Sequence, residues 1–220
     1  MRFDDYLAAL AQAQTRPLPA TDAQILMAPE PRSGWEPGRI PEDCRAGAAL
    51  LVVFPIDGWS HLLLTKRASH LRHHPGQVAF PGGELDADES ITEAARREAH
   101  EEVGISVDEV RVDATLTPLH VPVSRYAIHP VLAHLKHRPT LVAAPDEVAQ
   151  ILEIPLGELA RPDGRKIDLR ERGDQTHRVP YLDVAGERLW GATAMIVAEW
   201  LVWIGYGDNP WQRRQSSPRG

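Results

Sequence analysis

The sequence contains only one cysteine, Cys44. A single thiol excludes an intramolecular disulfide and a zinc site built from cysteine ligands, and it suits a reducing compartment. The sequence also lacks an apolar run of the roughly 18 residues that would predict a membrane-spanning helix. Its first ten residues, MRFDDYLAAL, carry acidic side chains and no apolar stretch of the signal-peptide type. These absences predict a cytoplasmic protein that does not cross a membrane.

Basic charge is scarce as well, because 24 Lys and Arg residues face 31 Asp and Glu residues, which gives a formal net charge of −7. This balance argues against a nucleic-acid or anionic-membrane partner, although a local basic patch could still bind a small anionic substrate. Internal repeats are absent. A length of 220 residues predicts one main domain with elaborations, as a monomer or homodimer.

Short apolar runs and turn signals predict a mixed α/β (α+β) domain. Residues 46–54 and 61–65 flank the Asp57-Gly58 turn and predict a hairpin, and residues 110–117 and 127–136 predict further strands. A second hairpin is expected where residues 165–171 and 177–184 flank Gly173-Asp174, with residues 188–190 extending its second arm.

Helices are expected at both ends of this domain. Residues 3–13 carry apolar side chains at helical spacing, and residues 193–204 are apolar on almost every side, which is typical of a buried helix. Residues 28–41 are too rich in proline and glycine for a regular element. We therefore expect an N-terminal helix and arm over 1–45, the main domain over 46–205, and a flexible tail over 206–220.

The stretch from Gly82 to Ile105, GGELDADESITEAARREAHEEVGI, carries the most distinctive chemistry. Ser90 and Glu93 form a capping-box pattern, and Gly104 is a helix stop, so a helix is predicted between them. Its last turns place Glu98, Glu101 and Glu102 on one face, at the negative end of the helix dipole. A solvated acidic face is one interpretation. A divalent cation is the other, because Mg²⁺ prefers carboxylate oxygens and leaves room for substrate phosphates.

The same stretch resembles the Nudix box. The matching residues are Gly83, Glu89, Arg97, Glu98, Ala99, Glu101, Glu102, Gly104 and Ile105. Ala99 is small for its aliphatic position, and every polar and glycine position is filled. The resemblance implies the Nudix fold, a mixed sheet sandwiched between helices, and hydrolysis of a diphosphate with Mg²⁺ or Mn²⁺.

The resemblance also implies roles for individual residues. Glu98, Glu101 and Glu102 would bind the metal, with the Gly82 carbonyl as a further ligand. Arg97 would orient the acidic helix by pairing with Glu89. The general base would be Glu98, or Glu147 from a distant loop, with Asp146 and Glu153 as weaker alternatives.

A second motif precedes the box. The stretch from Leu63 to Gly83, LLTKRASHLRHHPGQVAFPGG, resembles an additional motif of coenzyme A pyrophosphatases within the Nudix family. The resemblance implies cleavage of coenzyme A or its derivatives to 3′,5′-ADP and 4′-phosphopantetheine. The residues that match this motif and are expected to contact substrate are Arg67, Arg72, Gly76, Phe80 and Gly83. Arg67 and Arg72 could bind phosphate oxygens bidentately, although single arginines are more often surface or ion-pair residues.

Other functions stay open from the sequence. The box alone also fits a pyrophosphatase for ADP-ribose or another nucleoside diphosphate derivative. A non-catalytic ligand-sensing module is disfavoured because all the box glutamates are present. An RNA-end hydrolase is disfavoured because the chain has no basic stripe.

Overall fold

The computed structural model describes residues 1–206 with the exception of Arg72 and Pro162. The expected flexible tail therefore lies outside the described residues apart from Tyr206. Within the described residues, no helix is long and apolar enough to cross a membrane.

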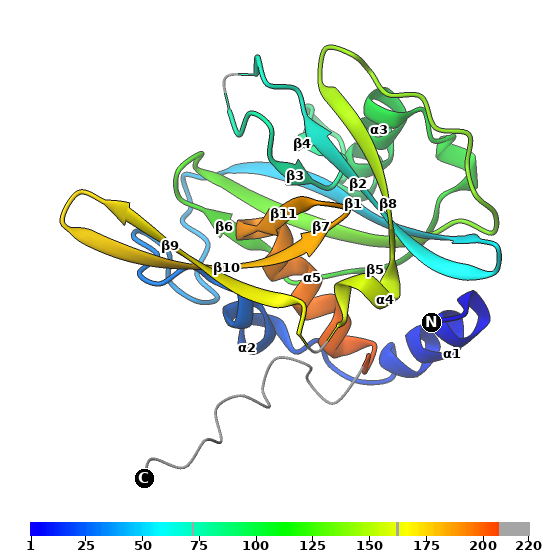
Figure 1. Cartoon of the computed structure of the whole chain (residues 1–220). Helices are drawn as coiled ribbons and strands as arrows, with labels where there is room; N and C mark the ends of the chain where they lie inside the picture. Colours follow the sequence, from blue (N-terminus) through cyan, green and yellow to red (C-terminus); the bar gives the residue numbers. More distant parts are fainter. Residues whose placement is uncertain (72, 162, 207–220) are drawn as a thin grey trace, which may run out of the picture.

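Helices lie at both ends of the chain and in its middle (Figure 1). The α-helices are α1 (Phe3–Ala13), α2 (Ala20–Gln24), α3 (Ile91–Val103), α4 (Leu156–Leu159) and α5 (Gly191–Trp203), and the 3-10 turns are η1 (Ile25–Met27) and η2 (Val107–Glu109). The strands are β1 (Arg45–Ile56), β2 (Trp59–Arg67), β3 (Val78–Ala79), β4 (Gly82–Glu84), β5 (Arg111–Thr115), β6 (Leu119–Val121), β7 (Tyr126–His134), β8 (Val148–Pro155), β9 (Arg165–Arg172), β10 (Gln175–Val184) and β11 (Glu187–Trp190).

Strand β1 is the centre of the main sheet. It pairs in parallel with β7 on one side, and on the other side it pairs antiparallel with β4 near its start and with β2 near its end. Beyond these neighbours, β8 and β3 pair with β2, and β5 and β6 pair with β7. The expected hairpin around Asp57 and Gly58 is confirmed, and both turn residues have positive φ angles, 49° and 77°.

The side chains of β1 alternate between two hydrophobic cores, as the two-residue period of a strand requires. Leu50, Val52 and Phe54 pack in the core that contains the buried alanines of α3. Leu51 and Val53 pack in the core that contains α1 and α5. The expected mixed sheet between helices is confirmed.

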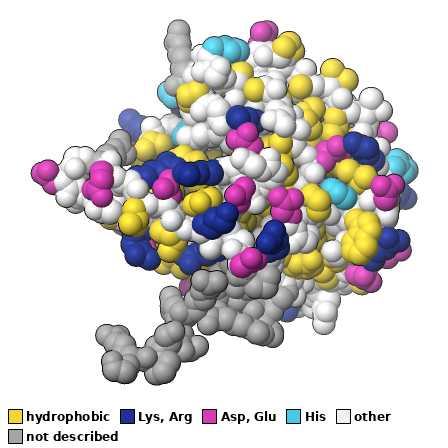
Figure 2. Space-filling model, viewed as in Figure 1, with side chains coloured by type: hydrophobic (Ala, Val, Ile, Leu, Met, Phe, Trp, Pro, Cys, Tyr) yellow, Lys and Arg dark blue, Asp and Glu magenta, His cyan; other side chains and the backbone are white. Residues whose placement is uncertain are grey.

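A separate three-stranded sheet in the order β11-β10-β9 lies beside the main sheet (Figure 1). Our expectation that residues 188–190 extend the second arm of the hairpin was wrong. After Val184 the chain turns at Ala185 and Gly186, which have positive φ, and returns as the independent strand β11. Lys66 of β2 reaches this strand through an ion pair of 2.6 Å with Glu187. Figure 2 shows lysine and arginine side chains gathered over this sheet, with acidic side chains among them.

The N-terminal segment packs onto the domain rather than projecting from it. Tyr6 of α1 is fully buried, and its ring meets that of Trp200 of α5 edge to face at 6.0 Å. Residues 28–41 contain no helix or extended strand, as expected, and they contact the hairpin through backbone hydrogen bonds between Glu30 and Arg178. Helix α2 was not predicted. Its Gln24 donates a hydrogen bond of 2.8 Å to the buried Glu199 of α5.

Candidate active site

Helix α3 begins and ends where its capping residues predict. The backbone N–H of Glu93 donates to the Ser90 hydroxyl at 3.3 Å, and the backbone N–H of Ser90 donates to the Glu93 carboxylate at 2.9 Å. Gly104 ends the helix with φ of 76°, a value that favours glycine. The small side chain of Ala99 is completely buried against the sheet. A small residue at this position lets the helix lie close to β1, and this explains its departure from the aliphatic pattern.

The three glutamates of the helix lie at different depths. The side chain of Glu101 is 56% exposed, that of Glu98 is 13% exposed, and that of Glu102 is only 2% exposed. Their spacing of three and four residues places the three side chains on neighbouring turns of the helix, as expected. Because they are buried to different depths, each carboxylate has a different electrostatic environment.

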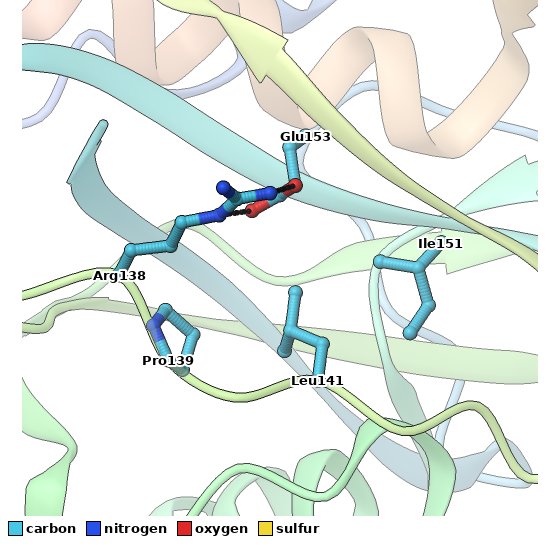
Figure 3. A pocket seen from close by; sticks show the side chains of 5 residues that line it. All are labelled: Arg138, Pro139, Leu141, Ile151 and Glu153. Atoms are coloured by element: carbon cyan, nitrogen blue, oxygen red, sulfur yellow. Dashed lines mark hydrogen bonds and ion pairs between the residues drawn. The ribbon is translucent and has the colours of Figure 1, made fainter. Parts of the chain in front are cut away.

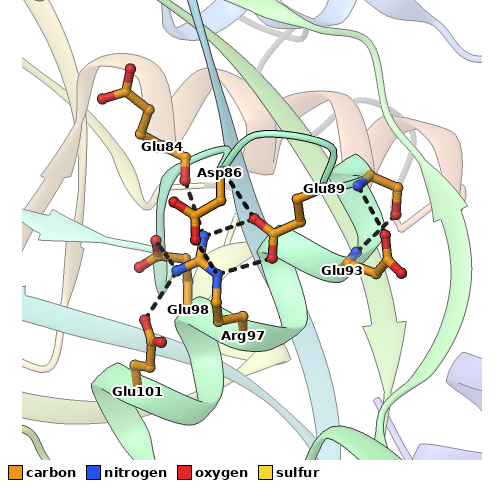
Figure 4. Close-up of polar contacts among 8 residues, drawn as sticks. Glu84, Asp86, Glu89, Glu93, Arg97, Glu98 and Glu101 are labelled. Carbon is orange, nitrogen blue, oxygen red and sulfur yellow. Dashed lines mark hydrogen bonds and ion pairs between the residues drawn. The ribbon is translucent and has the colours of Figure 1, made fainter.

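Arg97 connects Glu98 and Glu101 to the loop that precedes the helix (Figure 4). Its Nε and Nη2 donate to the two carboxylate oxygens of Glu89, each at 2.9 Å, so the expected pair is confirmed. Its Nη1 donates to Glu98 at 2.8 Å and to Glu101 at 3.0 Å. Hydrogen bonding from Arg97 lowers the pKa of Glu89. One guanidinium therefore holds three carboxylates around itself.

Glu102 lies at the base of the acidic cluster in an unfavourable environment for a charge. Burial raises its pKa to about 8, and the nearby charges of Glu147 and Glu98 act in the same direction, against the stabilising charge of Arg67. Its Oε1 is buried, and no hydrogen-bond donor of the described residues reaches it. Burial also raises the pKa of Glu98, partly offset by Arg97.

Glu147 reaches this cluster from the loop between β7 and β8. Its backbone carbonyl accepts a hydrogen bond of 2.8 Å from Ala68, which follows β2, and the neighbouring Ala144 N–H donates to the Glu102 carbonyl at 2.8 Å. The charge of Glu147 raises the pKa of both Glu98 and Glu102. The loop thus brings an exposed carboxylate, distant in sequence, next to the acidic helix.

Glu153, a weaker candidate for the base, has other partners. Its carboxylate binds Arg138 bidentately at 2.9 and 2.6 Å. The pair lines a cavity of about 420 Å³ together with Pro139, Leu141 and Ile151 (Figure 3). Glu153 is not among the charges that act on Glu98 or Glu102.

The acidic cluster suits a divalent cation. The unpartnered buried oxygen of Glu102 and the repulsion among Glu98, Glu102 and Glu147 are both relieved when carboxylates coordinate a hard cation. Across residues 1–206, leaving aside the two that are not described, no three acidic, histidine or cysteine side chains form a complete cation site. Arg97 holds the Glu98 and Glu101 side chains, so binding a cation requires these side chains to change partners.

Two glycines of β4 allow close contacts: Gly83 lies against the Glu98 carboxylate, and Gly82 lies against the backbone of Ala48. A Cβ atom on Gly83 would lie 2.3 Å from Glu98 Oε1, and one on Gly82 would lie 2.3 Å from the Ala48 carbonyl oxygen. The Gly82 backbone also hydrogen-bonds Glu102 and thereby lowers its pKa. At Gly82 the neighbouring atoms are backbone, so only glycine fits, whereas a larger residue at Gly83 would displace the Glu98 carboxylate.

The second motif contacts the acidic helix through Arg67. Arg67, at the end of β2, places its Nη1 3.9 Å from Glu102 Oε1. The Gly76 N–H donates to the Arg67 carbonyl at 3.2 Å, which brings the two motif residues together. Phe80 is only 5% exposed and packs in the hydrophobic core, so its side chain has a packing role here. Arg72 lies outside the described residues.

Tyr126 and Glu84 fill no fixed position of either sequence motif. The Tyr126 hydroxyl donates to Glu84 at 2.7 Å, and the Arg45 guanidinium lies 4.2 Å from the centre of the Tyr126 ring. Burial raises the pKa of Tyr126, and the charge of Glu98 adds to this effect. Tyr126 comes next to the acidic cluster only because β7 pairs with β1 over a long sequence separation, which no local pattern indicates.

Comparison with known proteins agrees with this geometry. Residues 45–172 match the NUDIX domain. The protein named Uncharacterized Nudix hydrolase NudL from Enterobacter sp. (strain 638) is 40% identical over 163 residues, which cover 73% of this chain and 84% of the relative. The protein of that name from Photorhabdus laumondii is also 40% identical over 163 residues, covering 73% and 86%. The one from Escherichia coli O7:K1 is 42% identical over 147 residues, covering 66% and 75%. With its box residues gathered around one acidic helix, the chain belongs to the Nudix hydrolase family.

Proposed function

We propose that the protein is a metal-dependent pyrophosphatase that hydrolyses the diphosphate of coenzyme A or its derivatives to 3′,5′-ADP and 4′-phosphopantetheine. The observation that carries the proposal is the contact of 3.9 Å between Arg67 and Glu102. Arg67 belongs to the motif that resembles coenzyme A pyrophosphatases, and Glu102 belongs to the Nudix box. Their proximity supports a single site that binds the substrate and hydrolyses its diphosphate.

Glu98, Glu101 and Glu102 would hold Mg²⁺ or Mn²⁺, with the Gly82 carbonyl as a further ligand. When bound, the cation supplies charge neutralisation for the diphosphate and makes an attacking water more acidic. Coordination also provides the partner that the buried Glu102 oxygen lacks.

The remaining steps depend on the side chains of the chain itself. Glu147 takes the proton of the attacking water, because it is an exposed carboxylate held beside the acidic helix. The water oxygen forms a bond to one phosphorus, and the bond from that phosphorus to the bridging oxygen breaks. Arg67 binds diphosphate oxygens and stabilises the charge that develops on them. Arg97 orients the acidic helix through its two hydrogen bonds to Glu89, while Glu98 and Glu101 turn from Arg97 to the cation.

Product analysis tests the proposal. The purified protein is incubated with coenzyme A or with ADP-ribose in Mg²⁺, in Mn²⁺ and with a chelator, and the products are separated by chromatography. We expect 3′,5′-ADP from coenzyme A only when metal is present, and a lower rate with ADP-ribose. Faster cleavage of ADP-ribose would show that the substrate class is ADP-ribose and related nucleoside diphosphates instead. No hydrolysis of either compound with metal would contradict the proposal.

A further inference from the structure

Arg32 has an unusual environment for an arginine. It lies on the arm, where its Nη2 donates to the His120 carbonyl of β6 at 3.3 Å and its Nη1 contacts the Met195 sulfur of α5. Its guanidinium lies 4.9 Å from the centre of the Trp35 ring. It is partly buried by the arm, the edge strand β6 and α5, and part of its surface is accessible to a ligand.

The charge of Arg32 is not balanced by an acid. Among the described residues no carboxylate forms an ion pair with it, whereas Arg39 on the same arm pairs with Glu36 at 2.8 Å. Burial lowers the pKa of Arg32 to about 10, and no acidic group counteracts this effect. The nearby His120 is 7% exposed, and its pKa is lowered by burial and by Arg32. A partly buried charge without an acidic partner is costly, and an anionic ligand would offset that cost.

The main sheet connects Arg32 to the acidic cluster. At this end of the sheet the strands follow the order β4, β1, β7 and β6, because β4 pairs with β1, β1 with β7, and β7 with β6. Three strand spacings separate β4, which carries Gly83, from β6, a distance of about 14 Å. The Arg32 guanidinium itself lies at β6 and against α5, so a small molecule that contacts both places has to be extended enough to cross these strands.

We infer that Arg32 binds a phosphate group that the substrate carries away from its diphosphate, with Trp35 supporting the guanidinium from one side. The inference rests on the proposed function, in which this group is the 3′-phosphate of coenzyme A. A planar guanidinium binds phosphate oxygens bidentately and does so better than an ammonium group. Arg32 lies outside residues 45–172, which match the NUDIX domain. In this inference Arg32 selects the substrate, and the residues around the acidic helix carry out bond cleavage.

The test compares coenzyme A with 3′-dephospho-coenzyme A, which lacks only the phosphate in question. For the wild type, Arg32→Ala, Arg32→Lys and the matched arm control Arg39→Ala, kcat/KM is measured on both compounds. A charge-assisted contact predicts that Arg32→Ala loses about 10- to 100-fold on coenzyme A and changes little on the dephospho compound. Arg32→Lys should recover part of the loss, and Arg39→Ala should behave as the wild type. Equal losses on both compounds would show a merely structural role and overturn the inference.

Binding measurements separate this inference from the proposed function. If the wild type does not cleave coenzyme A, the proposed function fails. The inference is then judged by calorimetric binding of 3′,5′-ADP and 5′-AMP. Tighter binding of 3′,5′-ADP that disappears in Arg32→Ala supports the phosphate site. Equal affinity of the wild type for the two nucleotides contradicts it.

Discussion

Arg97 explains how the acidic helix remains stable with three glutamates near its C-terminal end. A guanidinium carries five N–H donors in a fixed plane, and Arg97 directs them to Glu89, Glu98, Glu101 and the Glu84 carbonyl. Glu98 and Glu101 therefore share a positive partner. Of these three glutamates, Glu102 alone has a buried oxygen without a hydrogen-bond partner among the described residues. At the scale of single residues, Glu102 is the carboxylate that gains most from a cation.

Glu147 is the side chain that we expect to act as the general base. We predict that Glu147→Gln lowers kcat by about 100- to 10,000-fold, the usual contribution of a general base. The adjacent Asp146→Asn removes the weaker candidate, an exposed carboxylate of the same loop, and should lower kcat far less. Steady-state kinetics as a function of pH measures both variants. If Glu147→Gln keeps normal kcat, the proton is taken by Glu98 instead.

The ends of helix α3 are set by capping residues that can be recognised in the sequence. We predict that Ser90→Ala lowers the free energy of unfolding by about 1 kcal/mol, since it removes the side-chain cap of the helix. Ser106→Ala is the matched control, because Ser106 precedes the 3-10 turn η2 without a side-chain cap hydrogen bond. Denaturant unfolding of the two variants measures the difference. Equal effects of the two substitutions would show that the Ser90 hydroxyl contributes nothing specific.

Elements with local signals could be predicted, and elements that depend on distant partners could not. The bounds of α1, α3 and the hairpin at Asp57 and Gly58 follow from capping, apolar spacing and turn residues close in sequence. Strand β6 has only three residues and exists because it pairs with β7. Strand β11 was mistaken for part of β10, because the Ala185-Gly186 turn was not recognised. For the same reason the box glutamates could be named from the sequence, and Tyr126 and Arg32 could not.

For the whole molecule, Glu199 links three separate parts of the chain. It is completely buried on α5 and accepts hydrogen bonds from Gln24 of α2 and from the backbone N–H of Thr117 between β5 and β6. Burial raises its pKa despite these hydrogen bonds. The folded protein therefore favours the protonated carboxyl. This contribution to stability is fully present below the unfolded pKa of about 4.3 and is lost as pH rises through the folded pKa.

Glu199→Gln removes this titration. We predict that the free energy of unfolding of the wild type, minus that of the variant, decreases as the pH rises above about 4, by roughly 1.4 kcal/mol for each unit by which the pKa is raised. Denaturant unfolding at a series of pH values measures this difference. The control is Glu109→Gln, which replaces an exposed carboxylate and should show no such trend. A difference that is constant with pH would contradict the prediction.

We propose that the acidic helix forms a metal site that cleaves a diphosphate, and the Glu102→Gln variant tests this role. The measurement is Mg²⁺- and Mn²⁺-dependent turnover of coenzyme A, together with thermal unfolding in metal-free buffer. Below its pKa of about 8 the buried Glu102 is mainly protonated without metal, so a neutral glutamine should leave the fold intact. We predict loss of turnover by at least about 100-fold with an unchanged melting temperature. Near-normal turnover in this variant would contradict the metal site on α3.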